Sequence, residues 1–361
     1  MIRYSDDIWM RCNAVRESAR YSQAAHQLVM NRITEGRVEL STLQALCLLS
    51  LTEFYNADQV KSRIHSSLAI TLASCANLKN SAENFTGGVD AEERSRCYWS
   101  IILLRRLLGE STTSLDTQYR RSPSYPESPC MPPMAAVSPE GQRIASRSGL
   151  KSEGIVATVI KLSEVWSATQ DYVRARGSSE PAVVPWSPDS KYSATLRKLM
   201  DLGQKLPPLH RYRCIKPSSL TANDLEEARD YWAPWFLSRF LYHTIICLLN
   251  HPFLITMQMQ GIQGVSEVFL QQTTFSITHH TSWFLHFIAF LEARQFRITD
   301  PFFGYCAAVV ATIQVQQSFW EEGRLGQKKR DNYNRCLKFI QKIGQEWELM
   351  NRMADKLQTP G

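Results

Sequence analysis

The sequence predicts an all-α protein: a single large bundle-like domain of roughly ten helices with a long Ser/Pro-rich surface loop. Apolar residues recur at spacings of three and four along most of the chain, whereas the alternation typical of strands is nearly absent. Capping residues and prolines stand where several of these apolar runs begin. Of the 361 residues, 44% are hydrophobic and 21% are charged, values typical of a globular chain with a substantial core.

Two helices are expected between residues 41 and 75. The first follows the cap Ser41, and Asn56-Ala57-Asp58 interrupts its pattern. The apolar stripe of the second helix consists of Val60, Ile64, Leu68, Thr71, Leu72 and Cys75. The short break between the two helices predicts that they pack antiparallel.

The stretch EERSRCYWSIILLRRLLG, residues 92–109, has the pattern of one buried helix rather than of an arginine-rich segment that reads nucleic acid. Asp90 is the expected N-cap, with a capping-box Glu at position 93, and Gly109 ends the helix. Its main apolar stripe consists of Cys97, Ile101, Leu104 and Leu108. Apolar residues separate the arginines at positions 94, 96, 105 and 106, so we expect them to pair with carboxylates on neighbouring helices.

Ser and Pro dominate residues 110–149, which predicts a long surface loop. Residues 1–109 and 150–361 are therefore expected to be the N-terminal and C-terminal helices of one domain. The C-terminal helices are expected at 151–176, 188–204, from Thr221 to before Pro252, 265–295, 301–320 and 328–356. Pro234 is expected to kink or split the helix that contains it.

No motif in the sequence carries recognisable catalytic, metal or cofactor chemistry. The nine cysteines include no pair at zinc-ligand spacing, and no acid stands at ligand spacing beside His279, His280 and His286. Asp6-Asp7 lacks the further acids of a magnesium–diphosphate motif, and phosphate-binding glycine loops and nucleophile elbows are absent. We therefore expect no catalytic, cofactor-binding or metal-binding residues, and not an enzyme.

The charge, the hydropathy and the cysteine count indicate which partners and which cellular compartment to expect. The net charge of +7 permits attraction to polyanions without requiring it. The most apolar windows, residues 232–254 and 302–315, carry Arg239, His243 and Gln314, and the second is too short for a bilayer, so no membrane contact is expected. The odd cysteine count without an export signal favours a reducing compartment, the nucleus or the cytosol.

The cluster Lys328, Lys329 and Arg330 is a candidate basic patch. Such basic triplets bind nuclear-import receptors or contact phosphate groups. The simpler interpretation is the solvated start of a helix.

Four segments carry a family resemblance. The segment SRCYWSIILLRRLLG resembles the signature helix of the fungal-specific transcription factor domain, the all-α middle homology region of zinc binuclear cluster factors. The preceding pair, STLQALCLLSLTEFYNADQVKSRIHSSLAITLASCANL, is similar to that family's leucine-rich helix followed by a helix of small residues. FLYHTIICLLNHPFL and DPFFGYCAAVVATI resemble two later helices of the family. The four segments follow the family's order between residues 41 and 313, which is more specific than any one of them.

The resemblance extends to individual positions. Those that match are Trp99, Arg106, Leu107, Leu108, Tyr242, His243, Pro252, Phe253, Gly304 and Tyr305. Two positions depart from the family: Arg105 stands where an Asp is usual, and His251 stands where an Arg is common. An ion pair at either position is therefore in doubt, whereas the packing is not.

The resemblance also implies a DNA-binding module of six cysteines around two zinc ions, which this chain lacks, since only Cys12 precedes Cys47. The zinc cofactor is therefore expected to be absent. DNA would be reached only through a missing module or a partner. The sequence is then either a fragment or a shortened paralogue that keeps the regulatory domain.

The sequence thus predicts a nuclear regulatory domain that controls transcription through contacts with the transcription machinery or co-regulator proteins. A small-molecule effector that regulates the domain is compatible with this prediction. A homo- or heterodimer is compatible with this role, and the sequence does not determine the oligomeric state. The candidate effector pocket consists of Trp99, Trp235 and His243. The alternatives are an all-α enzyme of secondary metabolism acting on an apolar substrate, and a helical scaffold that heterodimerises with a full-length factor.

Overall fold

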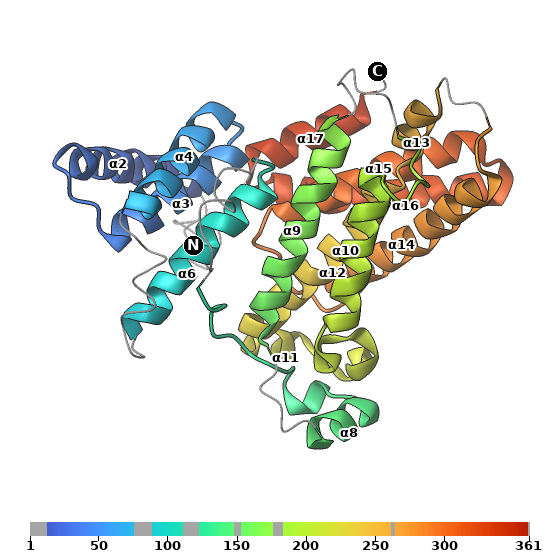
Figure 1. Cartoon of the computed structure of the whole chain (residues 1–361), viewed down its shortest axis with the longest axis horizontal. Helices are drawn as coiled ribbons and strands as arrows, with labels where there is room; N and C mark the ends of the chain where they lie inside the picture. Colours follow the sequence, from blue (N-terminus) through green and yellow to red (C-terminus); the bar gives the residue numbers. More distant parts are fainter. Residues whose placement is uncertain are drawn as a thin grey trace. The chain divides into compact units, whose positions relative to one another are not determined.

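In the computed structural model, the regular elements of the described residues are helices (Figure 1). The described residues are 13–75, 89–110, 123–147, 153–175, 183–260 and 264–359. Within them, one isolated antiparallel bridge joins Val137 and Ile215. The predicted all-α fold is confirmed. The predictions for Asp6-Asp7 and Cys12 concern residues outside those described.

The chain divides into two compact units. The first is formed by Met1–Pro126, Thr299–Pro301 and Ile340–Gly361, and the second by Glu127–Ile298 and Phe302–Phe339. The first boundary falls inside the predicted loop 110–149. Residues from 340 onward, which the sequence assigns to the C-terminal helices, belong to the first unit.

The described helices of the first unit are α2 (Ala14–Thr34), α3 (Leu40–Tyr55), α4 (Gln59–Cys75), α6 (Val89–Leu107) and α17 (Glu348–Gln358). The helix α3 contacts the other four and supplies Leu43 and Leu46 to the core, together with Ala69 of α4 and Ile101 of α6. The expected break between α3 and α4 is present, and Ala57 within it has a positive φ of 66°.

The buried face of α4 differs from the predicted apolar stripe. Val60 and Ile64 are 71% and 51% exposed, and Cys75 is also exposed. The residues of α4 that are buried are Ser62, His65, Ser66, Ala69 and Ala73. Small side chains allow helices to approach closely, and the buried hydroxyl of Ser50 on α3 donates to the Ser62 carbonyl oxygen at 2.9 Å.

The start of α3 also differs from the prediction. This helix begins at Leu40 with Glu39 as its N-cap, so the predicted cap Ser41 is wrong. The Ser41 hydroxyl donates to the Glu39 carboxylate at 3.3 Å and accepts from Arg32 at 2.9 Å. Its side chain is therefore engaged by charged groups rather than by the helix backbone.

The helix α6 confirms the prediction of a buried helix from residue 92 to Gly109. Cys97, Ile101 and Leu104 are buried, and Gly109 ends the helix with a φ of 77°. The predicted capping box is wrong, because Asp90 is already helical and the Glu93 carboxylate accepts from the Gln44 amide at 2.9 Å.

Two arginines of α6 pair with carboxylates in or next to their own helix, whereas the sequence predicted partners on neighbouring helices. Arg96 Nε lies 2.6 Å from Glu92 Oε1, one turn earlier. The buried Arg105 lies 3.2 Å from Glu110, which follows the end of the helix. An acidic residue one turn away or just past the helix end meets the cation at little entropic cost.

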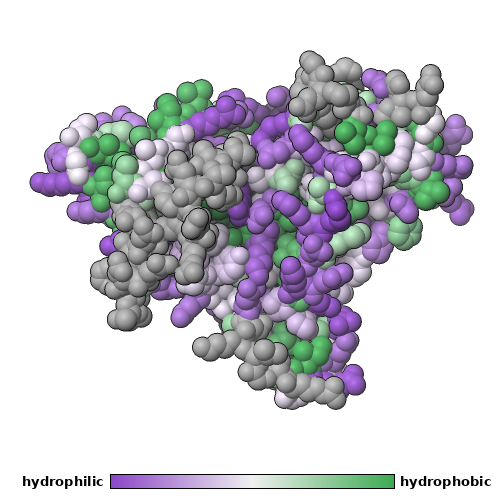
Figure 2. Space-filling view, viewed as in Figure 1, coloured by the Kyte–Doolittle hydropathy of each residue, from purple (hydrophilic) through white to green (hydrophobic). Residues whose placement is uncertain are grey.

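The second unit is built around α12 (Arg229–Leu249), which contacts α9 (Ile155–Arg174), α14 (Glu267–Ala293) and α15 (Phe302–Trp320). The other helices of this unit are α8 (Pro139–Arg147), α10 (Lys191–Lys205), α11 (Ala222–Glu227), α13 (Pro252–Met259) and most of α16 (Gly323–Gly344). In Figure 2 the outward faces of α9 and α10 are mainly hydrophilic, as expected for amphipathic helices that cover α12.

Three helix boundaries in the second half of the chain and its preceding connector differ from the predictions. Pro234 does not split its helix: the break falls at Ala228, where the φ and ψ of −110° and 40° separate α11 from α12. The segment from Pro139 to Arg147, expected to be loop, is the helix α8, which packs on the connector after α10. The predicted helix 328–356 is two helices, α16 and α17.

One segment of the described residues, Arg229–Met259, is long and apolar enough to cross a membrane by length and composition. It comprises α12 and α13, and 56% of its most apolar window is buried inside the structure. Because α12 contacts three other helices of its unit, we interpret this segment as the core of that unit.

Candidate functional site

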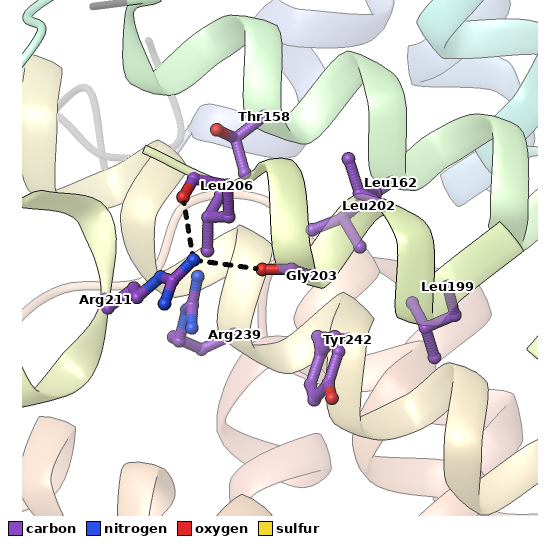
Figure 3. A pocket seen from close by; sticks show the side chains of 9 residues that line it. All are labelled: Thr158, Leu162, Leu199, Leu202, Gly203, Leu206, Arg211, Arg239 and Tyr242. Atoms are coloured by element: carbon purple, nitrogen blue, oxygen red, sulfur yellow. Dashed lines mark hydrogen bonds between the residues drawn. The ribbon is translucent and has the colours of Figure 1, made fainter. Parts of the chain in front are cut away.

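A pocket of about 260 Å³ lies in the second unit, between α9, α10 and α12 (Figure 3). Its walls are Thr158, Leu162, Leu199, Leu202, Gly203, Leu206, Arg211, Arg239 and Tyr242. This volume is near the lower end of the range for small-molecule sites. The pocket therefore suits a small metabolite.

The helix α10 provides the apolar wall. Leu199 and Leu202 stand three residues apart, so they lie on one face of the helix, and Leu206 is the C-cap residue that follows it. The N-terminus of α10 is fixed by the Ser190 side chain, which accepts from the Ser193 backbone N–H at 3.0 Å. With Leu162 of α9, these side chains form the apolar part of the pocket.

Arg239 is the charged residue that α12 contributes. Its Nε donates to the Ser238 hydroxyl at 3.3 Å, and its guanidinium lies 5.5 Å from the centre of the Trp235 ring. Both partners are neutral, and among the described residues no carboxylate lies within ion-pair distance of Arg239. Burial lowers the pKa of Arg239 to about 10, because it disfavours the charged form.

Arg211 approaches the pocket from the connector after α10. One of its terminal nitrogens donates to the carbonyl oxygens of Gly203, Gln204 and Leu206, at 3.2–3.4 Å. A cation at the C-terminus of a helix satisfies its last carbonyl groups and stabilises its dipole. The buried Nε of Arg211 has no hydrogen-bond partner among the described residues.

The remaining polar groups of the pocket are two neutral hydroxyls. Burial raises the pKa of Tyr242, and the nearby charge of Arg239 partly opposes that rise. Neither the Tyr242 hydroxyl nor the Thr158 hydroxyl has a hydrogen-bond partner within the part of the chain that the structure describes. The pocket therefore offers two cations and two hydroxyls, and none of its lining residues is acidic.

The three residues of the predicted effector pocket occupy different places. Trp99 belongs to the first unit, where its Nε1 donates to the Ser124 carbonyl oxygen at 2.9 Å. Trp235 and His243 lie on α12 in the second unit, and both rings contact Phe287, at 5.9 Å and 5.8 Å between centroids. Neither lines the pocket of Figure 3, but Tyr242, next to His243, does.

His243 is buried and pairs with His280 of α14 through their Nδ1 atoms, 2.8 Å apart. Burial lowers the pKa of His243 well below its usual range, and the charges of His280 and Arg239 lower it further. Burial also lowers the pKa of His280 to about 4. His286, on the same helix, lies 3.0 Å from the Tyr212 hydroxyl instead. No group of three potential metal ligands occurs among the described residues.

The other family positions lie mainly in packing contacts. Arg106 is buried in α6, Pro252 is the first residue of α13, and Gly304 is buried in α15. Tyr305 packs edge-on against Trp166, with the ring centroids 5.9 Å apart. At the departing positions, Arg105 pairs with Glu110 and His251 Nε2 lies 3.0 Å from the Thr312 hydroxyl.

The structure divides the candidate basic patch. Lys328 and Arg330 are exposed, whereas Lys329 is 9% exposed and donates to the Gln317 side chain at 2.8 Å. Burial lowers the pKa of Lys329, and the nearby Glu321 partly opposes this. Two of the three cations therefore face solvent.

Sequence reasoning missed the pair Arg211 and Arg239 as a site. The available signal was Arg239, the one Asp, Glu, Lys or Arg residue in the apolar sequence window 232–254. Arg211 gave no comparable signal, because it lies in a connector where charged residues are common.

Comparison with known proteins supplies one relative. The chain is 22% identical over 211 residues to the Zn(2)-C6 fungal-type transcription factor FTF2 of Fusarium oxysporum f. sp. lycopersici. The chain resembles a fungal zinc-cluster transcription factor. The match covers 57% of this chain and 18% of that protein, so the chain spans about a fifth of the length of its relative. No family profile and no solved structure matches the chain.

This distant similarity agrees with the family suggested by the four sequence segments.

Proposed function

We propose that this chain is the regulatory, middle homology domain of a fungal transcription factor. It acts in the nucleus and controls transcription through contacts with the transcription machinery or with co-regulator proteins. DNA is contacted by a module outside the chain or by a partner. The observation that carries this proposal is the similarity to FTF2 over 211 residues, within a helical chain.

The first unit offers side chains suited to such protein contacts. Leu28 of α2, Leu48 of α3, and Val60 and Ile64 of α4 are each more than half exposed. Exposed apolar side chains bind other proteins where they lie together in one patch. A heterodimerising scaffold would use the same side chains, so they support protein contact without choosing the partner.

The lining of the pocket argues against the enzyme alternative. General acid–base or nucleophilic catalysis uses carboxylates, imidazoles, thiols or activated hydroxyls. The pocket lining contains no Asp, Glu, His or Cys. Its arginines are suited to binding an anion rather than to transferring a proton.

A reporter assay tests the proposal. The chain is fused to an unrelated DNA-binding domain, and transcription from that domain's promoter is measured in a fungal host. We expect the fusion to change reporter transcription at least threefold in one direction, and a tagged chain to accumulate in the nucleus.

The control is the same fusion with Trp166→Asp, which places a carboxylate among buried aromatic rings and should disrupt the fold. Reporter output equal to that of the DNA-binding domain alone, together with a cytosolic chain, would contradict the proposal.

A further inference from the structure

We infer that the pocket between α9, α10 and α12 binds a small organic carboxylate with an apolar body. Its carboxylate would be held by Arg239 and Arg211. The binding follows from the geometry alone, whereas its role as the regulatory effector rests on the proposed function.

The first argument is the charge of Arg239. Arg239 is half-buried. A guanidinium that is largely withdrawn from water normally has a carboxylate partner, because removing an unpaired charge from water is costly. Its contacts here are the Ser238 hydroxyl and the Trp235 ring, both neutral. The fold thus holds a cation at the pocket wall without a counter-charge among the described residues, and an anionic ligand supplies one.

The second argument is that Arg211 joins Arg239 at the same site. In the view of Figure 3 the two guanidinium groups lie at one end of the pocket, with Leu162 and Leu199 toward the other end. Arg211 uses one terminal nitrogen on the carbonyl groups that end α10, and its Nε is left without a hydrogen-bond partner among the described residues. Guanidinium groups bind carboxylates through two parallel hydrogen bonds, so both arginines retain donors for a ligand.

The rest of the lining defines the body of the ligand. Four leucines line the pocket: Leu162 of α9, Leu199 and Leu202 of α10, and Leu206 at the C-cap of α10. This apolar lining favours an aliphatic chain over a sugar or a nucleotide. Thr158 and Tyr242 add two neutral polar residues to the lining. A volume of about 260 Å³ restricts the ligand to a short or medium chain.

Such a ligand would link elements that are far apart in sequence. It would contact Arg239 on α12 and Arg211, which holds the end of α10. A ligand that binds only this arrangement stabilises it in proportion to its concentration and affinity. If a second arrangement of α10 exists, the ligand shifts the balance by its difference in affinity for the two.

Binding is tested with the whole purified chain by calorimetry and by thermal unfolding. The probes are hexanoate, the neutral isostere hexanamide, hexyl phosphate and inorganic phosphate. We expect saturable binding of hexanoate with a rise in the unfolding temperature, and at least tenfold weaker binding of hexanamide. Equal binding of the acid and the amide would overturn the inference. If hexyl phosphate bound more tightly than hexanoate, the ligand would not be a carboxylate. If inorganic phosphate bound as tightly as hexanoate, the ligand would need no apolar body.

The variant Arg239→Met keeps an unbranched apolar stem and removes the charge. We expect it to lose hexanoate binding at least tenfold while unfolding at the same or a higher temperature, since it removes a half-buried cation that has no carboxylate partner among the described residues. Arg330→Met, a matched charge removal at an exposed position of the same unit, should bind hexanoate like the original chain. Unchanged binding by Arg239→Met would overturn the inference.

The reporter fusion separates the two proposals. Binding of hexanoate by the pure chain, combined with a reporter that never responds to the fused chain, supports the pocket and contradicts the proposed function. An active reporter, combined with no binding of any probe, supports the proposed function and overturns the pocket.

Discussion

At the scale of single residues, the second unit holds polar groups whose protonation the fold restricts. His243 and His280 face each other through Nδ1 atoms 2.8 Å apart, so one must donate and the other accept. His279, Arg239 and Tyr242 lie near this pair, and burial disfavours its charged form. Both imidazoles are therefore neutral in the folded chain at neutral pH.

This pair predicts acid sensitivity. The folded pKa of each imidazole lies below the unfolded value of about 6.5. Above that pH neither state binds the protons and stability is unaffected. As the pH falls from about 6.5 to about 4, these histidines bind protons in the unfolded chain but not in the folded chain. The free energy of unfolding therefore declines by up to about 1.4 kcal/mol per pH unit for each histidine.

The pH effect is checked by urea unfolding of His280→Gln between pH 7 and pH 4.5. We expect a shallower loss of stability with falling pH than in the original chain. His286→Gln, at an exposed position of the same helix, is the control and should leave the slope unchanged. A slope that His280→Gln does not reduce would refute this assignment.

At the scale of elements, α4 shows how a helix can bury its less hydrophobic face. The face toward α3 carries serines, alanines and His65, whereas Val60 and Ile64 are exposed. His65 bonds to the Glu53 carboxylate at 2.5 Å and to the His26 ring at 2.9 Å. Short side chains and satisfied polar groups thus allow this face to pack closely.

The packing of α4 predicts opposite responses on its two faces. Ala69, 1% exposed, has no room for a larger side chain, so Ala69→Leu should destabilise the chain by about 1–3 kcal/mol. Ile64→Ser, on the exposed face, should change stability by less than about 0.5 kcal/mol. Chemical denaturation of the two variants measures both effects. The reverse order of effects would mean that the predicted apolar stripe is buried after all.

At the scale of the whole molecule, some of the cations behind the net charge of +7 are buried and cannot contact nucleic acid. Arg105 and Arg106 are buried in α6, and Lys329 turns inward. What remains of the candidate basic patch is Lys328 and Arg330, whose charges attract phosphate without reading base sequence.

We therefore expect this chain alone to bind duplex DNA weakly and without sequence preference. If two phosphates are contacted, affinity should fall by about tenfold between 50 and 200 mM salt. Gel-shift titration of random and promoter DNA at both salt concentrations is the measurement. Selective binding of one sequence at the higher salt would contradict this expectation.

Some helix boundaries could be predicted from the sequence and others could not. The range of α14 and the end of α6 at Gly109 follow from local signals: apolar spacing and a glycine with positive φ. The helix α13 was missed, because eight residues after a proline give too short a pattern to distinguish from a loop. The break at Ala228 was misplaced at Pro234, since a proline near the first turns of a helix removes only one backbone bond.

The sequence by itself determined that this chain is helical, where most of its helices lie and which family its segments resemble, because helical spacing and chain breaks are local properties. Only the tertiary structure decided which face of α4 is covered and that Arg211 and Arg239, 28 positions apart, line one pocket. The helical period fixes which residues share a face. Which face is covered depends on the packing of segments that are distant in sequence.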